Sequence, residues 1–285
     1  MWTIAGKTVL ITGATRGIGL ETALSLAAQG ARPILVGRNE RRLARAFEAV
    51  CGRTRLRVTA YQCDLSSLAD VRRLAGEIRR DHARIDVLIN NAGGVHKRRT
   101  LTVDGLETTF ATNHLAHFLL TTQLLDVMVA SAPSRIVTVA SIGHRRGTLE
   151  FNDLGLARGY GIMRAYSRSK LANVLFANEL ARRLSGTGVT SNSVHPGGVA
   201  TDLWSGAPLW AQPYIRLWLW RSLISPGAGA EPVARLAVDA NLQGVTGRYY
   251  EGVSEIAPAP LAQDAALAAR LWTESERLVH PAVVS

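Results

Sequence analysis

The chain has 285 residues, of which 47% are hydrophobic and 19% are charged, and its formal net charge is +11 at pH 7. This is the composition of an ordinary globular protein that can bury a core. The positive charge comes from scattered arginine pairs with no interleaved aromatic residues, so we assign it to solvated helix faces and expect no nucleic-acid partner.

Signals for secretion, membrane insertion and metal binding are all missing from the pattern. No signal peptide precedes the first apolar run, and the apolar stretch 209–224 is short for a membrane span and contains Arg216 and Arg221. Cys51 and Cys63 lack metal-binding or redox spacing. We therefore expect a cytoplasmic protein with no metal site and no transmembrane segment.

Short apolar runs alternate with stretches of helical periodicity along the whole chain. The expected strands are 8–12, 33–36, 56–62, 87–90, 135–140, 189–194 and 248–250. The expected helices are 18–29, 40–50, 67–80, 113–130, 166–184, 229–240 and 261–278. This alternation predicts an α/β fold with a doubly wound parallel sheet of the Rossmann type, whose ligands bind at the carboxyl ends of the strands.

No linker or repeat divides the sequence, so we expect one domain over residues 1–285. The cofactor-binding half is expected at roughly 1–140 and the catalytic and substrate half at roughly 141–285. The second half contains a segment rich in Gly, Pro and Trp at roughly 201–226, which is interpreted as an insertion.

The first motif with chemical meaning comes directly after the first strand. Thr12–Gly19 reads Thr-Gly-Ala-Thr-Arg-Gly-Ile-Gly, with glycines spaced Gly-x3-Gly-x-Gly. Glycines there let the backbone approach a pyrophosphate, and the next helix offers free N–H groups at its start. A tight turn is the alternative. The predicted cofactor contacts in this loop are Gly13, Thr15, Arg16, Gly17, Ile18 and Gly19.

The end of the second strand bears on the choice of dinucleotide. Arg38 follows that strand, and no acidic residue occurs before Glu40, which is expected to open a helix. Arg38, aided by Arg16, suits the 2′-phosphate of NADP(H), whereas an acidic residue would suit the ribose of NAD. Two surface arginines remain the alternative. The predicted cofactor is NADP(H).

Polar residues also close the third and fourth strands. Asp64 is expected to accept from the adenine amino group with Leu65 beside it, although a cap or turn role is the alternative. The run Asn91, Ala92 and Gly93 lets a cofactor lie against the backbone, unless it forms only a polar turn.

The pair Tyr166 and Lys170 carries the strongest indication of catalysis. Four residues apart, they share one face of a helix. A nearby ammonium favours the phenolate and brings the pKa of a tyrosine towards the working range. Lysine is rare in this arginine-rich chain, which supports a functional reading, although Tyr-x3-Lys alone is mostly structural.

Ser141 follows the fifth strand and can hold a substrate oxygen. Asn113 is either a buried polar residue or the holder of a relay water.

Together these motifs closely resemble the short-chain dehydrogenase/reductase family, over roughly residues 6–203. The resemblance implies a tetrad of Asn113, Ser141, Tyr166 and Lys170. Tyr166 would exchange the proton, Ser141 would hold the carbonyl, Lys170 would tune Tyr166 and grip the nicotinamide ribose, and Asn113 would support the relay.

The runs 113–120, 173–180 and 195–203 resemble the retinol-dehydrogenase-like branch of that family. The likeness implies that Val199 and Thr201 contact the nicotinamide end of the cofactor. The amino-terminal hydrophobic anchor of several animal members is not seen in this sequence.

Aromatic residues cluster after Thr201. Trp204, Trp210, Tyr214 and Trp218, together with His144, are the predicted substrate residues. The preferred interpretation of the segment is a lid over an apolar pocket. A membrane-surface helix, ordinary packing and a subunit contact are the alternatives.

The predicted function is an NADP(H)-dependent oxidoreductase that transfers a hydride between nicotinamide and a small lipophilic carbonyl or alcohol. A tailoring enzyme that catalyses dehydration or epimerisation and a non-catalytic NADPH sensor are the alternatives. A peripheral membrane contact and a homo-oligomer are left open.

Overall fold

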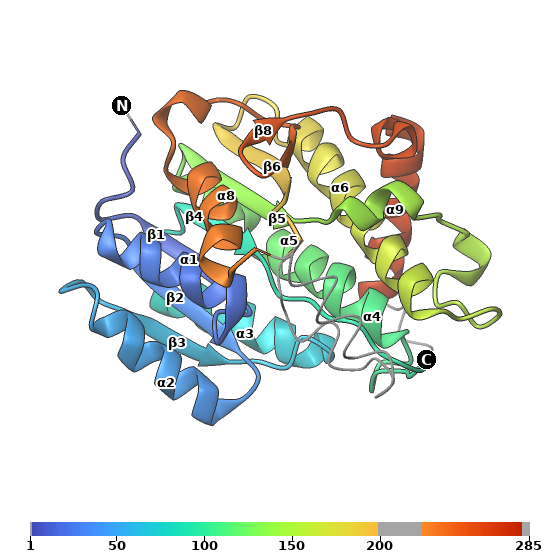
Figure 1. The fold of residues 1–285 in the computed structure, drawn as a ribbon, viewed down its shortest axis with the longest axis horizontal. Helices are drawn as coiled ribbons and strands as arrows, with labels where there is room; N and C mark the ends of the chain where they lie inside the picture. The colour runs from blue at the N-terminus through green and yellow to red at the C-terminus, as the bar shows by residue number, and fades with distance from the viewer. Residues whose placement is uncertain (1, 199–223, 281–285) are drawn as a thin grey trace.

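The computed structural model describes residues 2–198 and 224–280. Eight strands of the described part form one sheet in the order β3-β2-β1-β4-β5-β6-β7-β8 (Figure 1). Every neighbouring pair is parallel except β7 and β8, which are antiparallel. The predicted doubly wound parallel sheet is therefore confirmed, and β8 adds one antiparallel strand at its end.

The strands of the sheet are β1(Thr8–Thr12), β2(Arg32–Gly37), β3(Thr59–Gln62), β4(Val87–Asn90), β5(Ser134–Val139), β6(Val189–His195), β7(Tyr249–Glu251) and β8(Ser254–Glu255). The main helices are α1(Gly17–Ala28), α2(Glu40–Cys51), α3(Leu68–Asp81), α4(Thr108–Phe110), α5(Ala116–Ala130), α6(Ile162–Arg183), α8(Pro226–Val238) and α9(Ala265–Val279). Shorter helical turns are η1(Ala111–Leu115), η2(Ile142–Arg146), η3(Phe151–Asp153), η5(Ala240–Leu242) and η6(Pro260–Gln263).

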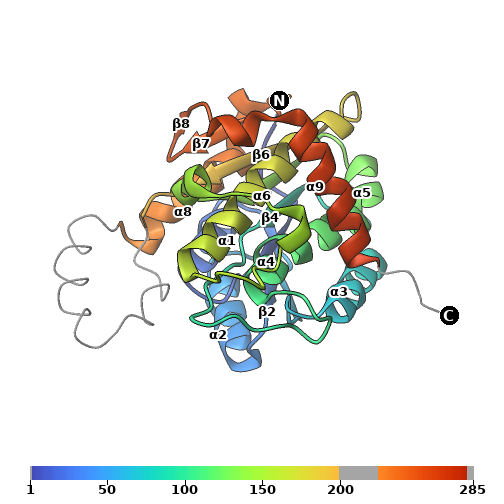
Figure 2. The ribbon, with the colours of Figure 1, turned by 90° about the vertical axis from the view of Figure 1, so that its right-hand side faces the viewer.

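Helices cover both faces of the sheet, because side chains on a parallel strand point alternately to its two faces. Along β1, Leu10 packs in the core with α3, α5, α6 and α9, whereas Val9 and Ile11 pack in the core with α1, α2 and α8. Figure 2 shows α1, α2 and α8 to the left of the sheet and α3, α5 and α9 to its right. Burial on both faces explains why the strands read as continuous apolar runs.

The strand order reverses between β1 and β4, which are paired neighbours. The chain leaves β1 towards α1 on one face and leaves β4 towards α5 on the other, so a crevice opens beyond their carboxyl ends. The loop 13–16 after β1, the loop 91–94 after β4 and Ser141 after β5 all belong to this edge.

Several boundaries differ from the sequence expectation. The helix expected from Asn113 begins at Thr108, because the Glu107 carboxylate accepts the N–H groups of Thr109 and Phe110 and caps it. It then passes through the π-helical turn η1, where the Ala116 N–H bonds the Ala111 carbonyl five residues earlier. The expected tail helix is split by Asp264, whose side chain caps α9.

Three further differences are smaller. Strand β3 begins at Thr59 and not at residue 56, and β8 was not predicted. Helix α6 begins at Ile162, one turn before the predicted start at Tyr166. The predicted insertion at 201–226 lies mostly outside the described residues.

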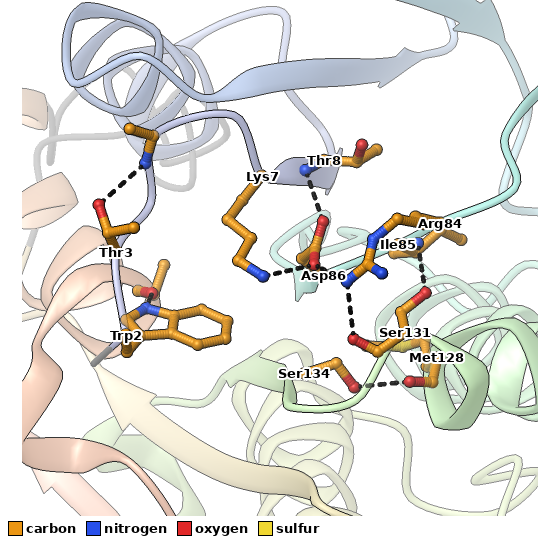
Figure 3. A network of polar contacts seen from close by, with 12 residues as sticks. Trp2, Thr3, Lys7, Thr8, Arg84, Ile85, Asp86, Met128, Ser131 and Ser134 are labelled. Atoms are coloured by element: carbon orange, nitrogen blue, oxygen red, sulfur yellow. Dashed lines mark hydrogen bonds and ion pairs between the residues drawn. The ribbon is translucent and has the colours of Figure 1, made fainter.

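At the amino-terminal ends of the strands, opposite the crevice, Asp86 holds neighbouring strands together and is 2% exposed. Its carboxylate accepts from the Lys7 Nζ at 2.9 Å, the Thr8 N–H at 2.9 Å and the Arg84 guanidinium at 2.8 Å (Figure 3). Burial alone would raise the pKa of Asp86, but the bonds from Arg84, Thr8 and Lys7 outweigh it and hold the pKa below its ordinary value. This cluster ties β1 to β4 at their amino-terminal ends.

In the part of the chain that the structure describes, no helix is both long and apolar enough to span a membrane.

Candidate active site

The first turn of α1 faces the crevice without a side-chain cap. Its N-cap residue Arg16 makes no capping hydrogen bond, and the first turn contains no acidic residue. By contrast, Asn39, Ser67 and Ser225 cap α2, α3 and α8 through their side chains. The N–H groups at the start of α1 are therefore available to an anion, and the helix dipole favours one there.

Glycines before α1 and in its first turn are required by the backbone conformation and by close packing. Gly13 has a φ of +68°, a left-handed conformation that favours glycine. A Cβ on Gly19 would lie 2.4 Å from the Gly13 carbonyl oxygen and 2.5 Å from the Asn91 Nδ2. The loop therefore lies directly against the end of β4.

The loops after β1 and β4 are joined by Thr12 and Asn91. The Thr12 hydroxyl accepts the N–H groups of Asn91 at 2.9 Å and Ala92 at 3.0 Å. In return, the Asn91 side chain donates to the Thr12 carbonyl at 2.8 Å. The run 91–93 is partly or fully exposed beside the glycine loop, as expected of a surface against which a cofactor lies.

The residues predicted to choose the dinucleotide lie at the ends of β2 and β3. Arg38 is exposed directly after β2, and Glu40 is the first residue of α2. Asp64 accepts from the N–H and the hydroxyl of Ser66 at 2.9 and 2.8 Å, so one carboxylate oxygen forms a turn. Leu65 packs partly buried against the core.

Tyr166 and Ser141 lie together beside Gly143. A Cβ on Gly143 would be 3.4 Å from a ring carbon of Tyr166 and 3.5 Å from the Ser141 Oγ, so both side chains lie within van der Waals reach of this position. Ser141 also accepts the Gly143 N–H at 3.1 Å, which fixes its rotamer. Burial raises the pKa of Tyr166, whereas its hydrogen bond with Ser141 favours the phenolate and opposes that rise.

Lys170 lies one turn along α6 from Tyr166 and is 4% exposed. Its Nζ donates to the Val139 carbonyl at 2.9 Å and lies 5.7 Å from the centre of the Tyr166 ring. Burial lowers the pKa of Lys170 to about 8. An ammonium with this pKa can lose and regain a proton near neutral pH.

Asn113 lies in the π-helical turn η1, and its side chain is fully engaged. Its Oδ1 accepts the Gly94 N–H at 2.9 Å, while its Nδ2 donates to the Gly94 carbonyl at 3.0 Å and the Ser169 Oγ at 2.9 Å. The side chain thus ties the loop after β4 to the helix that bears Tyr166 and Lys170. A role in proton relay would fall on the Asn113 main-chain carbonyl.

His144 is placed differently from the other candidates. It is fully buried, its Nδ1 lies 2.8 Å from the Ser141 carbonyl, and its Nε2 accepts the Ala259 N–H at 3.0 Å. Because both ring nitrogens bond the backbone, this placement favours a structural role over substrate contact. The other substrate candidates Trp204, Trp210, Tyr214 and Trp218, and the cofactor candidates Val199 and Thr201, lie outside the described residues.

Sequence reasoning did not single out three residues that assemble this crevice: Thr12 for its hydroxyl, Ser169 and His117. His117 was the one that the sequence could most readily have indicated. It is a histidine in an apolar helical run, four residues after Asn113, and a buried histidine needs a polar partner.

The arrangement brings a phenol, a hydroxyl and an amine to one edge of the sheet, beside a helix end suited to phosphate. A phenol beside an amine can move a proton to or from an oxygen, and a hydroxyl can hold that oxygen.

Comparison with known proteins agrees with this chemistry. A family profile described as short chain dehydrogenase matches residues 7–211. Retinol dehydrogenase 13 of Homo sapiens is 44% identical over 97% of this chain and 86% of its own length. Retinol dehydrogenase 14 of Mus musculus is 43% identical over 96% of this chain and 86% of its own length.

Solved structures show the same fold. An uncharacterized protein from Mycobacterium paratuberculosis matches with a TM-score of 0.80 and 34% identity, over 98% of this chain and 95% of its own. The RhlG/NADP active-site complex of Pseudomonas aeruginosa matches with a TM-score of 0.70 and 25% identity, over 93% and 98% of the two chains. The chain is therefore a member of the short-chain dehydrogenase/reductase family, in its retinol-dehydrogenase-like branch, and an oxidoreductase of a family that uses a nicotinamide cofactor.

Proposed function

We propose that this protein is an NADP(H)-dependent oxidoreductase of small lipophilic carbonyls or alcohols, with Tyr166 as its general acid and base. The contact between Tyr166 and Ser141, one helical turn from the buried amine of Lys170, is the observation that carries the proposal.

The crevice fits a dinucleotide. The uncapped start of α1 and the close-packed glycines accept the pyrophosphate through backbone N–H groups, and the residues that would hold the cofactor are those of the glycine loop with Asn91, Ala92 and Gly93. When it is bound, the nicotinamide supplies or accepts the hydride.

The side chains of the tetrad divide the proton chemistry among them. Ser141 donates a hydrogen bond from its hydroxyl to the substrate oxygen and so holds that oxygen beside Tyr166. In reduction, the Tyr166 hydroxyl gives its proton to the same oxygen, and in oxidation the phenolate takes it back. Lys170 favours the phenolate by its charge, and Asn113 fixes the loop after β4 against α6.

Two observations support the preference for NADP(H). Arg38 is exposed at the end of β2, and the first acidic side chain after that strand is Glu40, inside α2. An exposed guanidinium there suits the 2′-phosphate and leaves a bare ribose without an acceptor. Among the structural relatives, the RhlG complex contains NADP.

The rim of the crevice supports a lipophilic substrate. Ile142 follows Ser141, and Ile162 and Met163 precede Tyr166 by four and three residues on α6; all three are exposed. Large apolar side chains exposed beside a polar reaction centre are typical of a site that receives an apolar molecule. The names of the matched retinol dehydrogenases point to the same class of substrate.

The test is the oxidation of NADPH, followed at 340 nm, against a panel of aldehydes and ketones of increasing apolar size. We expect turnover in the wild type and a loss of a hundredfold or more in Tyr166→Phe, with nearly unchanged NADPH affinity. Tyr160→Phe is the matched control, because Tyr160 lies outside the tetrad and its hydroxyl donates to the His96 carbonyl at 2.7 Å. Near-normal turnover in Tyr166→Phe would refute the assignment, and NADPH binding without turnover on any carbonyl would favour a sensor.

A further inference from the structure

His117, at the second position of α5, is a buried side chain that the catalytic assignment leaves unexplained. It is 1% exposed and lies between the cofactor side and the proton-transfer side of the crevice. Its Nε2 is 3.0 Å from the Thr12 Oγ1, and its Nδ1 is 3.1 Å from the main-chain oxygen of Asn113. The imidazole therefore bridges the carboxyl end of β1 and the π-helical turn η1.

The partners of the ring determine its tautomer. A carbonyl oxygen can only accept, so Nδ1 carries the hydrogen and donates it to Asn113. Burial, followed by the positive charge of Lys170, lowers the pKa of His117 to about 3, so the ring is neutral and Nε2 has no hydrogen. Nε2 must then accept the proton of the Thr12 hydroxyl.

The Thr12 hydroxyl is consistent with this direction. It already accepts two N–H groups, from Asn91 and Ala92. Its single proton has two acceptors in reach, the His117 Nε2 at 3.0 Å and the Ile89 carbonyl at 3.3 Å, of which the ring is the nearer. A directed series of bonds thus runs from the backbone of residues 91 and 92, through Thr12 and the ring, to the Asn113 carbonyl.

The two ends of this series meet different parts of the site. Residues 91 and 92 belong to the surface proposed to support the cofactor. Asn113 lies beside Lys170, since a Cβ on Gly93 would be 3.2 Å from the Asn113 Oδ1 and 3.6 Å from the Lys170 Nζ. The Asn113 side chain is fully engaged, so its main-chain carbonyl is the group left to hold a relay water towards Lys170. His117 occupies one of the two lone pairs of that carbonyl.

We propose that His117 is a positioning residue that holds the Asn113 carbonyl in its relay orientation through Nδ1 and the cofactor surface in place through Nε2. The ring acts as a fixed hydrogen-bond bridge and exchanges no proton itself. This inference rests on the proposed function of Tyr166 and Lys170, and it adds a residue to which that function gives no role.

Two substitutions separate the two ends of the bridge. The amide of Asn lies where Nδ1 lies, so His117→Asn keeps a donor for Asn113 and loses the bond to Thr12. The amide of Gln reaches the position of Nε2, so His117→Gln keeps an acceptor for Thr12 and loses the donor for Asn113. For each variant we would measure the NADPH Kd by fluorescence titration, the pH profile of kcat and the solvent isotope effect on kcat.

We expect opposite patterns in the two variants. In His117→Asn, the NADPH Kd rises about tenfold, the size expected for one buried hydrogen bond, and the pH profile of kcat stays that of the wild type. In His117→Gln, the Kd stays within about twofold, while kcat falls about tenfold and its pH profile and solvent isotope effect change. Thr12→Val keeps the ring but removes its partner together with the acceptor of the Asn91 and Ala92 N–H groups, so the NADPH Kd should rise at least as much as in His117→Asn, with the pH profile of kcat unchanged.

His114→Gln is the matched control, because His114 is buried in the neighbouring turn and its Nε2 lies 2.9 Å from the Ser275 Oγ on α9. It should change Tm only. The inference is overturned if both His117 variants change Tm alone, or if both change Kd and kcat in the same way. Failure of the proposed function looks different, because the wild type itself would then show no turnover while the Kd measurements still report on the Thr12 end of the bridge.

Discussion

At the scale of single residues, burial gives Lys170 a proton affinity that differs from that of an ordinary lysine. With a pKa of about 8, lowered by burial, the amine is mostly charged at pH 7 and mostly neutral at pH 9. Tyr166 has a raised pKa and stays protonated through this range. Loss of the ammonium, and not ionisation of the phenol, should therefore limit carbonyl reduction as the pH rises.

The first prediction follows from this order of titration. For reduction, kcat/KM should be level below about pH 7 and should fall about tenfold per pH unit well above 8, because the free enzyme loses the Lys170 proton. Lys170→Arg keeps a charge at every pH of the profile, so its much lower activity should lack this fall. Rates measured from pH 6 to 10 with both proteins decide the matter, and the same descending limb in the variant would assign the titration to another group.

The second prediction concerns Arg38. Arg38→Asp replaces a charge-assisted contact to the 2′-phosphate by repulsion, so the Kd for NADPH should rise about a hundredfold and the Kd for NADH far less. Arg45→Asp is the matched control, because Arg45 is also exposed and lies further along α2. Isothermal titration calorimetry with NADPH and with NADH gives the ratio of variant Kd to wild-type Kd for each of the two variants. Equal weakening by the two variants would mean that net charge, and not a specific contact, selects the cofactor.

Residue identities at the strand ends were predictable because parallel strands deliver their carboxyl-terminal loops to one edge of the sheet. This is how Asn91 and Ser141 were proposed, whereas Tyr166 and Lys170 were proposed from their four-residue spacing on a helix. The placement of His144 was not predictable, since a histidine three residues after Ser141 suits the crevice and the core equally well by sequence. The Ala259 N–H that binds it comes from 115 residues away.

At the scale of elements, α1 combines a first turn without a side-chain cap with a close-packed glycine loop directly before it. Helices α2, α3, α8 and α9 have side-chain caps, whereas α1 and α6 do not, and of these two it is α1 that follows the glycine loop. A missing cap costs a helix about 1 kcal/mol, so the bare end is a stability cost located where an anion would bind.

The third prediction tests that loop with two glycines in helices. Gly19→Ala forces a Cβ against the Gly13 carbonyl and Asn91, so the loop must move, and the NADPH Kd should rise at least about tenfold with a lower Tm. Gly76→Ala in α3 has open space around its Cβ and should stabilise the fold by about 1 kcal/mol with unchanged Kd. Thermal melts and nucleotide titrations of both variants are required. An unchanged Kd in Gly19→Ala would show that the loop does not hold the cofactor.

The turn η1 is an element whose start and hydrogen-bond pattern the periodicity of the sequence does not predict. The apolar run after Asn113 predicts a helix, but neither the earlier start at Thr108 nor the five-residue hydrogen bond can be read from it. The cap is a glutamate, Glu107, and the π-helical geometry depends on partners in β1 and α6. Tertiary bonds to Asn113 and His117 therefore decide the local form of this element.

At the scale of the whole molecule, the carboxyl ends and the amino ends of the strands have separate roles. The carboxyl ends of the strands carry the proposed chemistry, while the amino ends carry the buried cluster around Asp86. A parallel sheet allows this separation, because every strand contributes one end to each edge.

The fourth prediction exploits the separation. Asp86→Asn removes the charge that Lys7 and Arg84 face and should destabilise the fold by about 2–3 kcal/mol, with unchanged kcat/KM. The pKa of Asp86 is lowered in the folded state, so its contribution is present above the unfolded pKa and is lost as the pH falls through the folded value. Urea unfolding at pH 7 and pH 3 should therefore show a difference between wild type and variant that shrinks in acid. A constant difference would assign the loss to packing and not to charge.

The bare start of α1 also links the abundance of this protein to its nucleotide. A ligand that completes the helix end binds the folded chain and not the unfolded one, and at a hundred times its Kd it adds about 2.7 kcal/mol of stability. Proteases that act on the opened chain would then meet it about a hundredfold less often. When the supply of the nucleotide falls, the same polypeptide would become short-lived, so the helix end would make its half-life in the cell a record of nucleotide supply.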